Sequence, residues 1–150
     1  MAWEGWDFVL GTWEGEGSGE PGEATAGGFT FAPDLDGRIL VRRSFSEWAP
    51  SAGRPGFRHD DLIVVDRDAS GTTRATYWDN EGHRIDYEVE VQGEPRAITF
   101  QTRERPGAER IRFVYRDRGP DRLEFAFDIA APGAAAFTTH VRGTARRVKH

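Results

Sequence analysis

Apolar and polar residues alternate along most of this chain, with a period of two rather than the period of a helix. In residues 83–91 (HRIDYEVEV), for example, Ile85, Tyr87 and Val89 alternate with charged side chains. Such alternation is typical of antiparallel strands that have one dry face and one wet face. It predicts strands at residues 26–33, 38–48, 58–66, 72–79, 83–91, 97–102, 110–116, 122–129 and 137–147.

Turn-forming sequences separate these segments, among them DASG (68–71), NEG (80–82) and RGPD (118–121). With the glycine-rich residues 11–19 as a further strand, the count reaches ten. An open sheet of ten hairpins would leave two edges that invite aggregation, and pairing of the last strand with the first removes both. We therefore predict an all-β fold, a ten-stranded antiparallel up-and-down β-barrel in a single domain over residues 1–150. A two-sheet sandwich is the alternative.

Tryptophan and glycine are concentrated in the first seventeen residues. We expect a short helical plug through Trp3, Trp6 and residues 8–10 to close one end of the barrel, with Trp13 packed beside it. An arginine of the closing strand, Arg142 or Arg146, is expected to stack on the Trp13 indole. Because glycine lets a strand bend and its neighbours approach closely, we interpret the glycines around Trp13 as structural.

The stretch GTWEGEG (11–17) carries the pattern GxWxGxG through Gly11, Trp13, Gly15 and Gly17. Gly-x-Trp near the start of an all-β chain is similar to the signature of the calycin superfamily, which includes lipocalins and fatty-acid-binding proteins. The longer pattern resembles the nitrobindins. That resemblance implies a ten-stranded, lipocalin-like barrel that binds haem b and is linked to nitric-oxide and peroxynitrite chemistry.

The closing strand carries the second part of this resemblance. In TTHVRGTARR (138–147), His140 precedes Arg146 and Arg147 as the haem histidine does in nitrobindins. The resemblance therefore implies that His140 is the axial ligand of haem iron, and that any metal is bound only in this way. Two stretches in the middle of the chain look instead like a bacterial calycin-type group, and this likeness implies no particular function. They are RPGFRHDDLIVV (54–65) and YWDNEGHRIDY (77–87).

Strand phase leaves the direction of His140 open. Phe137, Val141 and Ala145 share one face of the last strand, and His140 lies on the other. If the apolar face points inward, His140 faces solvent. A β-bulge, or a barrel with a polar lining, would bring it inside.

Two other histidines are candidates for chemistry. His83 is in phase with Ile85 and Tyr87, so it could face the barrel mouth, where His83 and Tyr87 would act as catalytic residues in proton transfer. The alternative is a histidine that caps its own turn. In the HDD stretch, His59 and Asp61 share a face, but two ligands do not complete a metal site. We expect these residues to form a hydrogen-bonded strand entrance.

Aromatic residues on the expected inner faces predict the lining of a ligand pocket. If the barrel is wide enough, they surround an apolar pocket for a small hydrophobic or aromatic molecule; otherwise they fill a structural core. A ten-stranded barrel favours the pocket. The predicted lining residues are Phe29, Phe31, Phe45, Tyr77, Tyr87, Phe100, Phe113, Tyr115, Phe125 and Phe127.

Composition narrows the possible functions. The chain has no cysteine, which excludes disulfides and thiolate chemistry, and acidic residues outnumber basic ones by 25 to 20. Scattered positive charge argues against a nucleic-acid partner. The start lacks the features of a signal peptide, and no apolar stretch is long enough for a membrane helix, so we expect a cytoplasmic protein, monomeric or homodimeric.

Three functions remain open at this stage. The first is a barrel that binds a small hydrophobic ligand, with haem as the most specific expectation. The second is an isomerase or cyclase that acts on a hydrophobic intermediate inside the barrel. The third is a structural barrel with a filled core.

Overall fold

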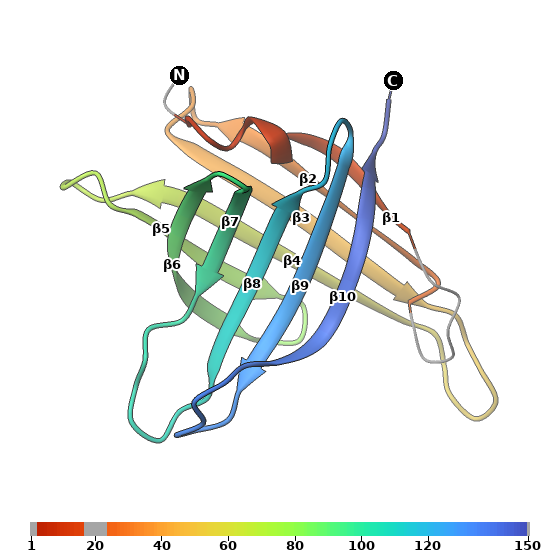
Figure 1. Cartoon of the computed structure of the whole chain (residues 1–150). Coiled ribbons are helices and arrows are strands. Elements are labelled where there is room, and N and C mark those ends of the chain that lie inside the picture. Colours follow the sequence, from red (N-terminus) through yellow and green to blue (C-terminus); the bar gives the residue numbers. More distant parts are fainter. Residues whose placement is uncertain (1–2, 17–23, 150) are drawn as a thin grey trace.

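The computed structural model describes residues 3–16 and 24–149, and the ten strands in this part of the chain form one closed antiparallel barrel. Each strand pairs with its neighbours in sequence, and β1 pairs with β10, which confirms the predicted up-and-down barrel (Figure 1). The elements are η1 (Asp7–Val9), β1 (Gly11–Glu16), β2 (Ala26–Asp34), β3 (Ile39–Trp48), β4 (Phe57–Arg67), β5 (Thr73–Asp79), β6 (Arg84–Gly93), β7 (Arg96–Gln101), β8 (Arg110–Asp117), β9 (Arg122–Ala130) and β10 (Thr138–Arg147).

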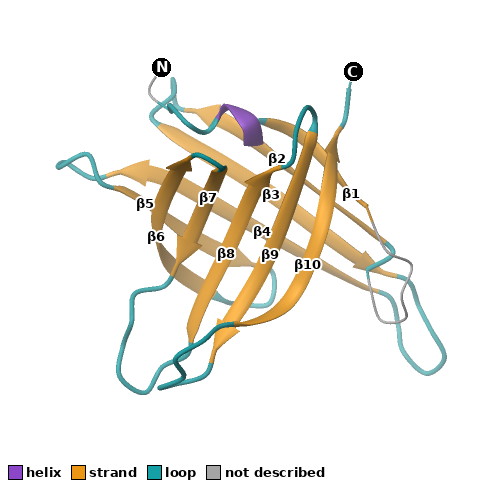
Figure 2. Cartoon of the chain, in the orientation of Figure 1, coloured by secondary structure: helices purple, strands orange, loops and turns teal. Residues whose placement is uncertain are grey.

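The N-terminal segment closes one end of the barrel, which we call the plug end (Figure 2). The Trp6 ring packs against Phe31 of β2 and Phe100 of β7, with ring centroids 6.3 Å and 6.0 Å away. The Trp3 indole N–H donates to the carbonyl of Gly37 at 2.7 Å. The predicted plug is therefore present, but its helix amounts to the single 3-10 turn η1. No helix in the described residues has the length or apolar character needed to span a membrane.

The glycine-tryptophan stretch joins this plug to the seam between β1 and β10. The Trp13 indole N–H donates to the carbonyl of Val9 at 2.8 Å, and the guanidinium of Arg147 stacks on the indole at 4.4 Å. Arg147 also donates to the carbonyls of Leu10 and, at 3.3 Å, Phe8. A Cβ on Gly11 would lie only 2.7 Å from the Arg147 side chain, so glycine leaves room for this contact.

The prediction that Arg142 or Arg146 stacks on Trp13 is wrong, because strand register decides which arginine reaches the indole. Trp13 pairs with Arg147, whereas Arg146 pairs with Glu14 and forms an ion pair with it on the outer face. Gly17, the last glycine of the motif, lies outside the described residues.

Most side chains that point into the barrel are fully buried in the half next to the plug, which we call the filled half. Seven of them are at most 1% exposed: Phe31, Leu40, Ile63, Val65, Ile98, Phe100 and Leu123. Contacts with Trp6 join them to the plug in one continuous core. Val91 of β6 shares their inward phase but is 38% exposed at the barrel end, beside Gly5. This half of the barrel is packed like an ordinary protein interior, which leaves no room there for a guest molecule.

Inward side chains become exposed toward the opposite end, which we call the open half. On β10, Ala145 is 0% exposed and Val141 is 52% exposed, although alternation points both inward. On β9, Leu123 is buried, whereas Phe125, Phe127 and Ile129 are only half-buried. The same trend holds on β8, where Tyr115 is buried and Ile111 and Phe113 are half-buried. Solvent therefore reaches the inner faces of the strands at this end.

The phase of β3 is opposite to the one predicted. Leu40 and Arg42 are buried inward, and Phe45 lies on the outer face, where its ring covers Gly28 and the guanidinium of Arg58 stacks on it at 4.6 Å. The assignment of Phe45 to the inner lining is thus corrected. Both phases of β3 contain apolar residues, and a buried ion pair, which periodicity does not reveal, makes the inward position of Arg42 possible.

Candidate functional site

The two stretches that resemble a bacterial calycin-type group come together on neighbouring strands. They are residues 54–65 and 77–87. β4 pairs with β5 so that Asp61 lies opposite Asp79, and the β5–β6 turn folds back beside them. We define the mouth cluster as five residues that this pairing gathers at the open half: His59, Asp61, Tyr77, Asp79 and Glu81.

His59 is the centre of the mouth cluster. Its Nδ1 lies 2.7 Å from a carboxylate oxygen of Glu81. Its Nε2 lies 3.1 Å from a carboxylate oxygen of Asp61 and 3.1 Å from the hydroxyl of Tyr77. Both ring nitrogens thus face acceptors, although a neutral imidazole carries only one N–H. The neighbouring Asp60 points outward and accepts a hydrogen bond from Arg58 instead.

Asp79 anchors the β5–β6 turn. Its side chain is 3% exposed and accepts hydrogen bonds from the Tyr77 hydroxyl and from the backbone N–H groups of Glu81 and His83, each at 2.9 Å. Burial by itself would raise the pKa of Asp79, but these hydrogen bonds and one from the His83 ring outweigh it and lower the pKa to about 2. Asp79 is therefore a carboxylate at neutral pH.

Arg42 crosses the middle of the barrel below the mouth cluster. It donates to the hydroxyl of Tyr115 at 2.9 Å, on β8, which is the strand opposite β3 in the barrel order. It also forms an ion pair with Asp61 on the adjacent strand β4 and lies over the ring of Phe113 at 5.4 Å. Arg42 thus forms the floor of the open half and separates it from the filled half.

Burial and charge shift the pKa values of the groups around this floor. Burial disfavours the charged form of Arg42, but attraction to Tyr115 and Asp61 outweighs it and raises the pKa of the guanidinium above its ordinary value. Burial also raises the pKa values of Tyr77, Tyr87 and Tyr115. At neutral pH the floor therefore has one charged arginine surrounded by neutral phenols.

The wall opposite the mouth cluster is aromatic. The rings of Phe113 and Phe125 are parallel, with centroids 6.5 Å apart, and Phe127 lies 6.2 Å from Phe113. Gly143 makes room for this wall, because a Cβ there would lie 2.5 Å from the Phe125 ring. The open half therefore has one polar side, on β3–β5, and one aromatic side, on β8 and β9.

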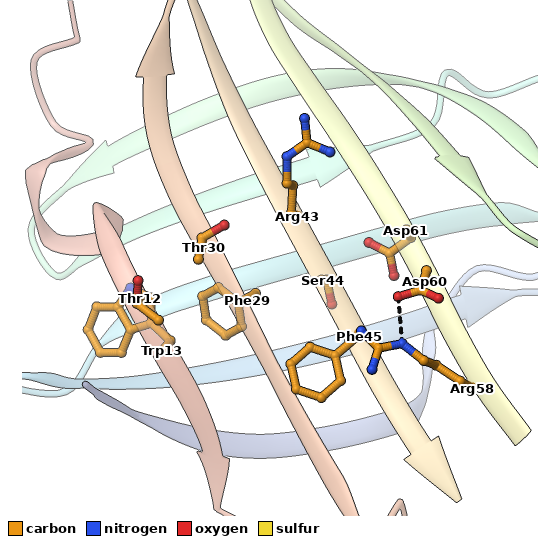
Figure 3. A pocket seen from close by; sticks show the side chains of 10 residues that line it. All are labelled: Thr12, Trp13, Phe29, Thr30, Arg43, Ser44, Phe45, Arg58, Asp60 and Asp61. Carbon is orange, nitrogen blue, oxygen red and sulfur yellow. Dashed lines mark hydrogen bonds and ion pairs between the residues drawn. The ribbon is translucent and has the colours of Figure 1, made fainter. Parts of the chain in front are cut away.

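A groove of about 410 Å³ crosses strands β1–β4 (Figure 3). Phe45 and Arg58 lie over it, and Arg58 donates to Asp60 at 2.9 Å. Strand alternation places these side chains, with those of Thr12, Thr30 and Arg43, on the outer face of the barrel. Its lining also includes Trp13, Phe29, Ser44 and Asp61, which alternation places on the inner face, so the groove borders the mouth cluster at Asp61.

The predicted catalytic and haem residues occupy different places. His83 is in the β5–β6 turn, with an exposed side chain whose Nδ1 lies 2.9 Å from Asp79, so it caps its own turn. Tyr87 is buried against Phe100 and lies near the floor. His140 is exposed on β10, at a β-bulge between Thr139 and Val141.

The predicted pocket residues divide between the two halves. Phe31, Tyr87, Phe100 and Tyr115 belong to the floor or to the filled half. Tyr77, Phe113, Phe125 and Phe127 are half-buried in the open half, and Phe29 is buried beside Trp13. Sequence reasoning missed Arg42 altogether; its signal was a charged residue directly after the apolar run 39–41 and in phase with Leu40.

No protein-family model matches this chain, and no curated protein matches it either. The closed ten-stranded barrel is consistent with a calycin-like fold. These comparisons add no support for the nitrobindins specifically, so haem b, the cytoplasmic location and the oligomeric state remain predictions.

The Arg42–Asp61 pair should be energetically coupled. Replacing Arg42 by Met leaves a buried carboxylate without its cation, and we expect the free energy of unfolding to fall by about 3 kcal/mol. Asp61→Asn alone should also destabilise, whereas Arg42→Met/Asp61→Asn should lose at least 1 kcal/mol less than the two single losses together. Urea unfolding followed by tryptophan fluorescence measures all four proteins. Additive losses would show that the two side chains do not depend on each other.

Proposed function

We propose that the protein binds a small, mainly apolar molecule in the open half of the barrel. The observation that carries this proposal is that inward aromatic and aliphatic side chains of β8, β9 and β10 become exposed toward the open end, from fully buried Ala145 to half-exposed Val141 on the same strand. Inward aromatic rings that solvent reaches are an unfavourable arrangement unless something covers them. A filled structural barrel would bury both halves equally.

The two sides of the open half indicate what kind of molecule fits. Phe113, Phe125 and Phe127 offer flat apolar contacts, and Asp61, His59 and Tyr77 offer hydrogen-bonding groups on the facing side. A pocket of mainly apolar lining with a few placed polar groups is typical of small-molecule sites. We infer a flat or elongated ligand with a polar group on one edge.

Proton transfer within such a ligand is a possible activity of the same site. His59, rather than His83, is the histidine that lines the inner face, and it lies beside the Tyr77 hydroxyl. The isomerase or cyclase hypothesis therefore passes from His83 and Tyr87 to His59 and Tyr77. A histidine whose ring is oriented by a carboxylate is suited to act as a general base.

A pair of neighbouring substitutions on β10 tests whether the ligand enters the open half. Val141 points inward at the mouth and Arg142 points outward, and both are exposed. Nile red, a neutral apolar dye, should bind with saturable fluorescence and a 1:1 stoichiometry. We expect Val141→Trp to weaken this binding at least tenfold because the indole occupies the mouth, and Arg142→Trp to change it less than twofold.

The opposite pattern, or dye binding that never saturates, would contradict a site in the open half. Phe45→Ala is a second control, because the Phe45 ring lies on the outer face of β3 under Arg58. Loss of dye binding in that variant alone would move the site to the outer face.

Haem b is the most specific ligand in this proposal, and the resemblance of the sequence to nitrobindins supports it. Hemin added to the purified protein should shift its Soret band, and His140→Ala should abolish the shift if His140 is the axial ligand. His59→Ala is the matched control, since His59 is the histidine on the inner face. A shift that depends on His59 would reassign the ligand, and an unchanged spectrum would exclude haem.

A further inference from the structure

We propose that His59, Asp79 and Glu81 form a binding site for one divalent transition-metal ion at the rim of the barrel. Each residue offers one ligand atom, and the three atoms lie within 4.8 Å of one another. Two atoms bonded to one ion at about 2.0–2.2 Å lie at most about 4.4 Å apart, so a small side-chain movement brings the three atoms into one coordination shell. The site shares His59 with the open half, but its argument does not rest on the ligand proposed there.

The three ligands come from two segments that only the fold brings together. His59 belongs to β4, Asp79 ends β5, and Glu81 lies in the turn that follows. The sequence predicted a hydrogen-bonded strand entrance at His59 and Asp61, because two ligands do not complete a metal site; Asp79 and Glu81 come from the neighbouring strand and its turn. Asp60 is not among the ligands, because it points outward to Arg58.

The surroundings of His59 favour a cation. Its two ring nitrogens face the carboxylates of Glu81 and Asp61 at 2.7 Å and 3.1 Å. A neutral ring donates to one of them, and its other nitrogen then directs a lone pair at a carboxylate oxygen. A metal ion bound by both that nitrogen and the carboxylate removes the repulsion between the lone pair and the carboxylate oxygen.

The charges around the cluster also favour a bound cation. Asp61, Asp79 and Glu81 provide three carboxylates, and Arg42 is the sole arginine or lysine of the described chain in an ion pair with any of them. Arg42 is held by Asp61, so in the described residues the ion pairs of Asp79 and Glu81 are with histidines only. The Asp79 side chain is 3% exposed and is fixed by backbone N–H donors, so it is already oriented for binding.

The donor set indicates the class of ion. One imidazole nitrogen and two carboxylate oxygens suit Zn²⁺ or a similar first-row ion better than Ca²⁺, which prefers six to eight oxygen ligands. Glu81 is half-exposed, so solvent reaches the rim and can complete the coordination shell. The ring of His83 contacts Asp79, which makes His83 a positioning residue rather than a ligand.

Cobalt titration of the full chain, free of any affinity tag, tests the site. Co²⁺ should bind with a 1:1 stoichiometry in calorimetry and develop visible absorption bands from its d electrons, and Zn²⁺ should displace it. We expect His59→Ala and Glu81→Gln each to weaken binding at least tenfold. Glu81 lies in an exposed turn, so its variant keeps the test valid if His59→Ala fails to fold.

Matched controls use the same residue types elsewhere on the surface. His140→Ala removes an exposed histidine and Asp60→Asn removes the adjacent carboxylate that faces outward, and both should leave the affinity within twofold. Absence of saturable Co²⁺ binding would overturn the proposal. Binding that survives His59→Ala, or that is lost in His140→Ala, would also overturn it.

Discussion

A charged guanidinium in the middle of the barrel is the constraint on which the rest of the structure depends. A buried arginine is costly unless its charge is neutralised and its donors have partners. Asp61 supplies the negative charge from the next strand, and Tyr115 supplies an acceptor from the strand across the barrel. Because these partners have to meet Arg42 at one level, the register of β3, β4 and β8 is tied to a single side chain.

The contacts of Arg42 with Asp61 and Tyr115 divide the barrel interior into two parts with different properties. On one side, apolar side chains and the tryptophans of the plug pack into a continuous core. On the other side, hydrogen-bonding residues of β4 and β5 face the phenylalanines of β8 and β9, and solvent reaches both. The packed core of the filled half stabilises the fold. The open half can therefore remain accessible to solvent and to the ligand proposed for it.

Much of the fold could be predicted from sequence, because strand alternation is a local pattern repeated along the chain. Closure then follows from the cost of leaving two sheet edges open. The identity of the inward face was less certain wherever both faces carried apolar residues, as on β3, where Phe45 proved to be outside. The mouth cluster could not be assembled from spacing alone, since it needs the register that places Asp61 opposite Asp79. Arg147, rather than its neighbour, stacks on Trp13 for the same reason.

Methyl NMR with a soluble nitroxide measures whether solvent reaches the inner wall of the open half while the core of the filled half stays dry. TEMPOL should broaden the methyl signals of Ile85, Ile111, Ile129 and Val141, which point inward in the open half. Those of Leu40, Ile63, Ile98 and Leu123 should stay sharp. Equal protection of both groups would contradict the account, because the barrel would then be closed at both ends.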